Sequence, residues 1–215
     1  MLKVSRDDLF RAVVAVKAAS AGKTSIPILG TVRMSVSDGE MVLTCCDTAM
    51  MATARIPCDG GDIYGCVSAD TIADISKKLP AGSDVSIDAS TAGRIAVKCG
   101  RSRFTLPTLD AADFPAFTVG DAVATFLIAA DDLAGLINAT RFAVSTDTTR
   151  WYLNGVYLTA HDGRLRMVAT DGHRLAVADG PDVGGIQPAI IPRTAIESVR
   201  RSLGDGDVTI SLYHT

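Results

Sequence analysis

The chain of 215 residues is 47% hydrophobic and 21% charged, the balance of a soluble globular protein, and its net charge of −3 predicts no global attraction to nucleic acid. No apolar run approaches the roughly 18 residues of a membrane helix, and Asp7-Asp8 stands where a secretion signal needs an apolar core. The five cysteines include no Cys-x-x-Cys pair, which argues against a zinc site or a disulfide framework. We therefore expect a cytoplasmic protein with reduced thiols and no metal or other cofactor.

The first predicted elements are a helix and a hairpin. Ser5-Arg6-Asp7-Asp8 has the spacing of a capping box, so a helix should run from there to about Ala18. Apolar residues then alternate over 32–36 and 41–45, on either side of Asp38-Gly39. This pair favours a tight turn between two strands, so the segment predicts a β-hairpin.

A second helix and further strands follow. Ser68 can cap a helix that Pro80-Ala81-Gly82 ends. Strand patterns return over 85–108, and residues 110–120 read as a connection. Up to this point the chain predicts two helices packed on antiparallel strands.

The second half predicts the same order of elements. A helix is expected over 131–143, and a hairpin turns at Asp162-Gly163. Residues 180–188 are predicted as a loop, and Pro192 is placed in the first turn of the last helix, where proline is tolerated. Three apolar residues of that helix should face the core: Ile196, Val199 and Leu203.

An internal repeat explains this similarity. Asp47 and Asp171 align at an offset of 124 residues, and the register holds across nearly all of the second half. The same offset aligns Asp8 with Asp132, Leu9 with Leu133, Leu29 with Leu153, Asp38 with Asp162, Gly39 with Gly163, Ile72 with Ile196, and Leu79 with Leu203. The period is domain-sized, so the chain should contain two copies of one α+β unit with antiparallel sheets.

The repeat also separates scaffold from candidate site. Asp47 and Asp171 recur, so they should serve a turn that both copies share. The segments 150–152 and 173–174 have no chemical counterpart in the first copy, which carries Ile26-Pro27-Ile28 and Ala49-Met50 there. One predicted hairpin joins the two segments, so their ends should lie close in space.

The second copy is shorter than the first. It lacks a counterpart to residues 92–120, which read as strands, and a sheet without its closing strands has exposed edges. We expect the domains to cover 1–120 and 121–215, with the second incomplete and the chain a fragment of a longer protein.

Many basic residues fall on or beside the four predicted helices. They are Arg6, Arg11, Lys17, Lys77, Lys78, Arg141, Arg193, Arg200 and Arg201. The plain interpretation is a set of solvated helix faces. The alternative is a face that follows a phosphate backbone.

Five motifs, found in order along the chain, resemble the bacterial DNA polymerase III β subunit family, the β sliding clamps. They are Ile26-Pro27-Ile28-Leu29-Gly30, Gly100-Arg101-Ser102-Arg103-Phe104, Ala111-Ala112-Asp113-Phe114-Pro115, Tyr152-Leu153-Asn154-Gly155 and the segment from Ala169 to Val177. The resemblance implies the DNA-clamp fold, with a protomer of three domains that closes head-to-tail as a dimer around duplex DNA. It further implies that this chain holds the N-terminal and central domains and that the third is absent.

The resemblance also implies two sites. In the family, the helices line the hole of the ring that surrounds DNA. The resemblance therefore implies DNA contacts from Lys23, Trp151, Tyr152, Arg11, Lys77, Arg141, Arg193, Arg200 and Arg201. Trp151 stands where the family usually has tyrosine, and both offer a ring and a hydrogen-bond donor. A peptide-binding pocket is expected from Arg150, Leu153, Thr170, Gly172, His173, Arg174 and Leu175.

Three functions are weighed on this basis. The leading one is a non-catalytic processivity clamp, which would bind duplex DNA, the polymerase III catalytic subunit, the clamp loader and other proteins with clamp-binding motifs. A hydrolase could be drawn from Asp171, His173 and Ser145, but no nucleophile elbow or phosphate loop supports it. The third is a stand-alone peptide-binding fragment.

Overall fold

Two units of similar architecture make up the chain in the computed structural model, which describes residues 1–22, 24–117, 120–147 and 149–213. The units are Met1–Phe117 and Thr118–Thr215. All strand pairs between named elements are antiparallel among the described residues. The fold class is therefore α+β, as predicted. No helix in the described part of the chain has the length and apolar character to span a membrane.

The first unit contains two helices and two sheets. Its helices are α1 (Arg6–Lys17) and α2 (Ala69–Lys78), with 3-10 turns at η1 (Pro27–Gly30) and η2 (Ala111–Asp113). Its strands are β1 (Leu2–Ser5), β2 (Thr31–Ser37), β3 (Glu40–Cys46), β4 (Met51–Pro57), β5 (Asp59–Gly60), β6 (Tyr64–Ser68), β7 (Asp84–Asp88), β8 (Arg94–Cys99) and β9 (Ser102–Pro107). The sheet orders are β4-β3-β2-β6 and β5-β1-β7-β8-β9.

The second unit repeats this plan with fewer strands. Its helices are α3 (Ala130–Thr140) and α4 (Arg193–Ser202), with 3-10 turns at η3 (Arg141–Ala143) and η4 (Trp151–Leu153). Its strands are β10 (Ala122–Ala129), β11 (Gly155–His161), β12 (Arg164–Thr170), β13 (Leu175–Asp182), β14 (Ala189–Pro192) and β15 (Asp207–Tyr213). The sheet orders are β13-β12-β11-β14 and β10-β15. Among the described residues, one strand follows α4 in the second unit, whereas three follow α2 in the first.

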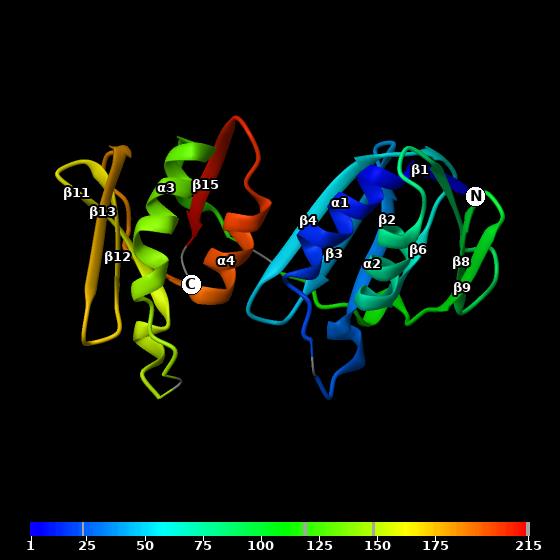
Figure 1. Ribbon diagram of the computed structural model, residues 1–215, viewed down its shortest axis with the longest axis horizontal. Helices are drawn as coiled ribbons and strands as arrows, with labels where there is room; N and C mark the ends of the chain where they lie inside the picture. The colour runs from blue at the N-terminus through cyan, green and yellow to red at the C-terminus, as the bar shows by residue number, and fades with distance from the viewer. Residues whose placement is uncertain (23, 118–119, 148, 214–215) are drawn as a thin grey trace. The chain divides into compact units, whose positions relative to one another are not determined.

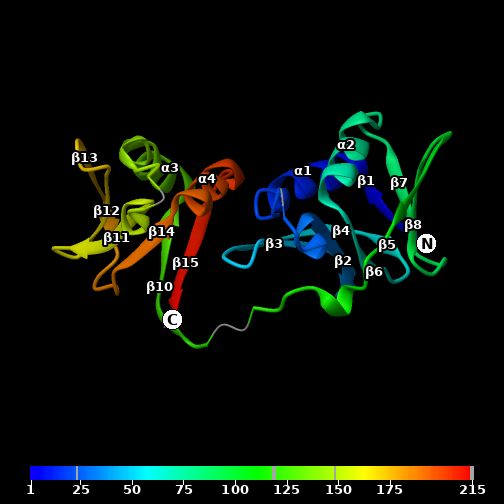
Figure 2. The ribbon, with the colours of Figure 1, turned by 90° about the horizontal axis from the view of Figure 1, so that it is seen from below.

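In each unit the two helices cover a four-stranded sheet (Figures 1 and 2). The first helix of each unit packs mainly on one edge strand and its neighbour: α1 packs on β4 and β3, and α3 packs on β13 and β12. The second packs on the remaining pair, α2 on β6 and β2 and α4 on β14 and β11. Each unit has a separate apolar core, one centred on Leu9, Met34 and Ile72 and the other on Ile137, Leu158 and Met167.

The local signals in the sequence formed the expected structures. The hydroxyl oxygens of Ser5 and Ser68 each accept a backbone N–H bond, so both serine caps are confirmed. Asp38 and Asp162 have φ values of 55° and 51°, and their following glycines have 76° and 79°. Positive φ at both central positions is typical of the tight hairpin turn that was predicted at each pair.

Four expectations in the second unit are corrected. The helix predicted over 131–143 ends at Thr140, whose hydroxyl bonds back to the Leu136 carbonyl at 2.8 Å, and continues as η3. The predicted loop begins later, because β13 continues through Pro181, which an edge strand tolerates. Pro192 lies at the N-cap of α4 rather than inside its first turn. Val199, expected in the core, is 38% exposed, because the packing of α4 on its sheet buries Ile196.

Candidate DNA-facing helices and peptide-binding surface

The 3-10 turn η4 presents two aromatic rings to solvent. Arg150 begins the turn, and the Leu153 N–H donates to the Arg150 carbonyl at 2.9 Å. Trp151 and Tyr152 are 74% and 52% exposed, and their rings meet edge to face with centroids 6.0 Å apart. Leu153 is half-buried, and its carbonyl accepts the Ser145 N–H at 3.0 Å. The turn thus holds two exposed aromatics beside a partly buried leucine.

The turn between β12 and β13 is built on the carboxylate of Asp171. Its Oδ1 accepts the backbone N–H groups of His173 and Arg174, both at 3.0 Å, and these bonds hold the pKa of Asp171 below its usual value. Thr170 Oγ1 donates to the Arg174 carbonyl at 2.7 Å and accepts the Gly172 N–H at 3.1 Å. The side chains of His173, Arg174 and Leu175 are exposed as a result.

The first unit makes the same turn without those side chains. Asp47 Oδ1 accepts the N–H groups of Ala49 and Met50 at 3.0 and 2.7 Å. The position that corresponds to Gly172 is occupied by Thr48, with φ 76°. The prediction that Asp47 and Asp171 serve a shared turn is confirmed, so His173 and Arg174 are additions to a common scaffold.

Arg150 joins the two segments of the second unit. Its Nε donates to Asp147 Oδ2 at 3.0 Å, and a Cβ built on Gly172 would lie 3.1 Å from its Nη1. The expectation that the two segments lie close in space is therefore confirmed. Hydrogen bonds from the side chain and backbone of Thr149, followed by the bond from Arg150, lower the pKa of Asp147 to about 2.

Phe142 contributes to this surface, although the sequence patterns did not predict it there. The Arg174 guanidinium carbon lies 5.7 Å from the centre of the Phe142 ring, and Arg174 Nε donates to Asp171 Oδ2 at 2.9 Å. Phe142 is 57% exposed and Leu175 66% exposed. The signal available in the sequence was that Phe142 is an aromatic residue lying off the apolar stripe of the helix expected over 131–143. We call the seven predicted peptide-site residues, together with Phe142, the candidate peptide surface.

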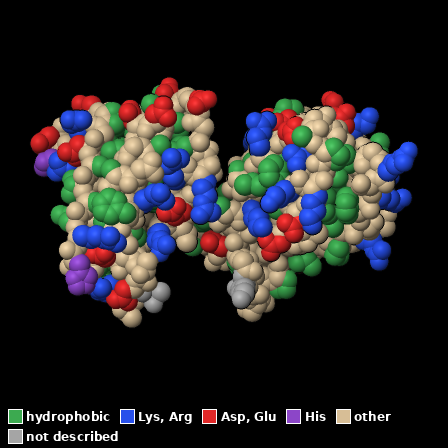
Figure 3. Space-filling model, viewed as in Figure 1, with side chains coloured by type: hydrophobic (Ala, Val, Ile, Leu, Met, Phe, Trp, Pro, Cys, Tyr) green, Lys and Arg blue, Asp and Glu red, His purple; other side chains and the backbone are tan. Residues whose placement is uncertain are grey.

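The basic candidate DNA-binding residues that the structure describes lie on α1, α2, η3 and α4, and Figure 3 shows Lys and Arg side chains over both helix pairs. In the first unit, Arg11 pairs with Asp8, and Lys77 is exposed. Lys17, at the end of α1, pairs with Asp70 at 2.6 Å. Lys23 lies outside the described residues.

In the second unit, four arginines form what we call the α3–α4 basic face: Arg141, Arg193, Arg200 and Arg201. Arg141 Nη1 donates to both carboxylate oxygens of Glu197 at 3.1 Å. Arg200 Nε donates to Asn138 Oδ1 at 3.1 Å. Arg193 and Arg201 are exposed. The face therefore combines charges from η3 and α4.

The geometry does not assemble the hydrolase triad. The Asp171 carboxylate accepts the backbone N–H of His173, with its other oxygen on Arg174. Ser145 is buried, and its Oγ accepts the Asp147 N–H at 3.1 Å. A nucleophile needs access and an adjacent base, so these groups act as turn scaffold. The described residues also contain no group of three or more His, Cys, Asp or Glu placed to hold a metal.

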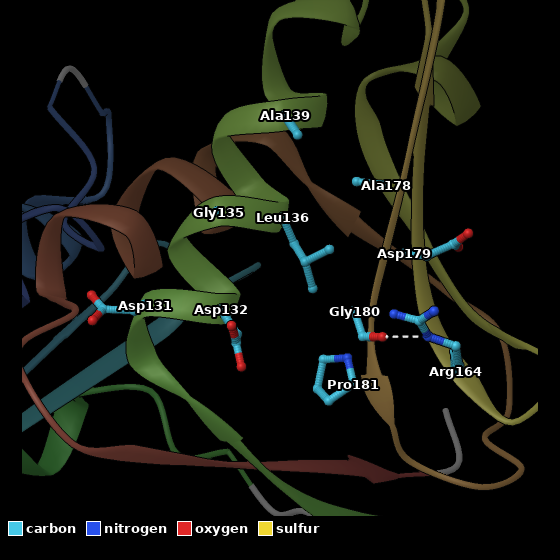
Figure 4. A pocket seen from close by; sticks show the side chains of 10 residues that line it. All are labelled: Asp131, Asp132, Gly135, Leu136, Ala139, Arg164, Ala178, Asp179, Gly180 and Pro181. Atoms are coloured by element: carbon cyan, nitrogen blue, oxygen red, sulfur yellow. Dashed lines mark hydrogen bonds between the residues drawn. The ribbon is translucent and has the colours of Figure 1, made fainter.

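An open hollow of about 530 Å³ lies between α3 and β13, away from the predicted site residues (Figure 4). Arg164 Nε donates to the Gly180 carbonyl at 2.9 Å on its strand side. A Cβ on Gly180 would meet Leu136 Cδ1 at 2.8 Å, so glycine lets the strand approach the helix. Charged and apolar groups line the hollow without converging on one point, and it does not form part of either candidate site.

The repeated units, each with two helices over an antiparallel sheet, define the DNA-clamp class of proteins. Residues 1–118 match the family described as DNA polymerase III beta subunit, N-terminal domain, and residues 127–215 match its central domain. The chain belongs to the DNA polymerase III β-subunit family.

Known relatives agree with this assignment. The beta sliding clamp of Caulobacter vibrioides is 36% identical over 98% of this chain and 59% of its own length, and that of Escherichia coli K12 is 36% identical over 95% and 57%. The crystal structure of the Pseudomonas aeruginosa sliding clamp bound to griselimycin superposes with a TM-score of 0.90 at 34% identity, covering 98% of this chain and 59% of that one. The Caulobacter crescentus clamp also gives 0.90, at 34% identity, covering 98% and 60%. The chain thus spans somewhat under two thirds of these relatives.

Proposed function

We propose that this chain forms the N-terminal and central domains of a bacterial sliding clamp, a non-catalytic processivity factor that encircles duplex DNA in the cytoplasm. The observation that carries the proposal is the repeated helix pair with basic side chains, in a chain that belongs to the β-subunit family. The domain boundaries are proposed at 1–120 and 121–215. A third domain, for which the greater length of the relatives leaves room, would close a homodimeric ring.

The proposed DNA contacts are made to phosphates. Arg11 and Lys77 would act from the first unit, together with Lys23, and the α3–α4 basic face from the second. Trp151 and Tyr152 offer an exposed indole N–H and a phenol O–H, on a turn whose next residue, Asn154, accepts the Arg193 backbone N–H at 2.9 Å. Such contacts position the protein on the duplex but read no sequence. They suit a protein that must move along DNA of any sequence.

The proposed partners bind the candidate peptide surface. Leu153 and Leu175 supply apolar contact area, Gly172 leaves space, and Arg150 and Arg174 can reach peptide carbonyls while their stems pack on apolar groups. The partners would be the polymerase III catalytic subunit, the clamp loader and other proteins with a clamp-binding motif. Those motifs are short runs of the glutamine-leucine-x-leucine-phenylalanine kind, whose apolar side chains can pack on an exposed leucine next to a glycine.

A titration with labelled DNA tests the proposal. Two duplexes of unrelated sequence are titrated with the protein across a salt series. We expect equal affinities for both and a steep loss of binding with salt, because phosphate contacts release counterions. Sequence-dependent or salt-independent binding would contradict it.

The exposed Leu175 also favours a second function, a peptide-binding module that acts without DNA. The same titration separates the two. Binding of a clamp-motif peptide in the absence of any duplex binding at low salt would support the second function.

A further inference from the structure

The centre of the α3–α4 basic face is occupied by a carboxylate. Glu197 is the one acidic residue of α4, whose sequence is RTAIESVRRS. It lies four positions after Arg193, and Arg200 and Arg201 follow it by three and four, so all three share its side of the helix. Arg141 reaches it from η3 with both oxygens at 3.1 Å. One carboxylate thus binds Arg141 directly and shares its side of α4 with three further arginines.

Stabilisation of the fold does not by itself explain the Arg141–Glu197 ion pair. The side chains of Arg141 and Glu197 are 43% and 30% exposed. Ion pairs this exposed to water stabilise a fold little. Arg200 shows how the same face orients an arginine without cancelling charge, because its partner is the neutral amide of Asn138 at 3.1 Å.

Basic side chains on the helices of the first unit also pair with carboxylates. Arg11 pairs with Asp8 of the same helix, and Lys17 of α1 pairs with Asp70 of α2 at 2.6 Å. A carboxylate therefore accompanies one candidate phosphate-binding residue in each unit, Asp8 beside Arg11 and Glu197 beside Arg141. This recurrence points to a role in binding rather than in one local fold.

We propose that Glu197 is a positioning residue that limits the DNA affinity of the α3–α4 basic face. The inference rests on the proposed function. The carboxylate holds Arg141 in place and competes with a phosphate for it, and it repels a duplex that approaches the neighbouring arginines. Each phosphate contact would then form and break easily, as movement along DNA requires.

The test compares duplex binding by the wild type with that of Glu197→Gln. Glutamine has the same shape and can still accept a bond from Arg141, so the fold is preserved while the charge is lost. We expect several-fold tighter binding at low salt and a salt slope steeper by about 0.9 for each additional phosphate that the protein neutralises. Thermal unfolding should change little.

A matched control and a second background make the result specific. Asp179→Asn also frees an arginine, Arg166, from a carboxylate (Nη2–Oδ2 2.8 Å) and changes the net charge equally, but it lies on β13. It should leave duplex affinity near that of the wild type. In an Arg141→Ala background, the increase in affinity from Glu197→Gln should shrink, because the contested arginine is absent.

The outcomes separate this inference from the proposed function. Unchanged or weaker binding by Glu197→Gln, with weaker binding by Arg141→Ala, would overturn the role of Glu197 and leave the DNA face intact. An equal increase in affinity from Asp179→Asn would also overturn it, since net charge alone would then explain the effect. If neither Arg141→Ala nor Glu197→Gln changes binding, the DNA face itself is wrong, and the inference falls with it.

Discussion

Gly172 and Arg150 meet across the candidate peptide surface: a Cβ built on Gly172, where φ is 91°, would lie 3.1 Å from Arg150 Nη1. The glycine therefore serves both the backbone of the Asp171 turn and the position of the arginine beside it. Thr48 adopts a similar φ of 76° at the corresponding place in the first unit. A side chain is thus tolerated by the turn itself, and the contact with Arg150 is what sets Gly172 apart.

Gly172→Ala should weaken peptide binding more than it weakens the fold. The backbone cost of a non-glycine residue at this φ is about 1 kcal/mol, whereas the new methyl group displaces the Arg150 head. The measurements are peptide titration and chemical unfolding. Gly184→Ala is the control, since φ is 70° there with nothing within 4 Å of the added Cβ. Equal loss of peptide affinity in both variants would show that strain, not Arg150, is responsible.

Leu175→Asp should abolish peptide binding with little loss of stability. Leu175 is 66% exposed in the free protein, so the change costs little until a peptide covers it and traps a carboxylate against apolar groups. We expect at least about a tenfold loss of affinity, or 1.4 kcal/mol, in a titration with labelled clamp-motif peptide. Leu127→Asp, at 64% exposed on β10, is the matched control and should bind as the wild type does. Similar affinity for Leu175→Asp and the wild type would place the peptide site elsewhere.

Arg201→Ala should weaken duplex binding equally for two unrelated sequences. If Arg201 contacts one phosphate, the salt slope should fall by about 0.9. Arg94→Ala removes the same charge from an exposed position on β8, outside the helices, and should have a smaller effect. Equal effects from the two substitutions would indicate that only net charge matters.

The hydrogen bonds that Thr149 and Arg150 donate to Asp147 should persist down to low pH. The pKa of Asp147 is lowered from 3.8 to about 2, chiefly by the Thr149 side chain. A lowered folded-state pKa contributes stability above the unfolded value, and this contribution is lost as pH falls through about 2. Carboxyl chemical shifts measured by NMR should therefore give a midpoint near this value, and Thr149→Val should move it upward. A midpoint that Thr149→Val leaves unchanged would assign the shift to another group.

The sequence by itself determined the units and their local structure. Ser5 and Ser68 each cap a helix, because each is followed by a helical apolar pattern. Asp38-Gly39 and Asp162-Gly163 form the hairpin turns, because Asp and Gly adopt the required positive φ values through local preferences. The repeated aspartates marked one turn in two copies, because a carboxylate bonds the N–H groups of residues close to it in the chain. Such short-range preferences can be read without knowing the rest of the fold.

The tertiary structure decided which distant side chains meet. Phe142 lies against Arg174 because α3 stops at Thr140 and η3 redirects the chain. Arg141 meets Glu197 because α3 and α4 cover the same sheet, and that packing also leaves Val199 exposed. These contacts depend on how helices and strands far apart in the sequence bury their apolar faces together. Periodicity shows which face of a helix is apolar, but only the packing sets which residues of another element lie beside it.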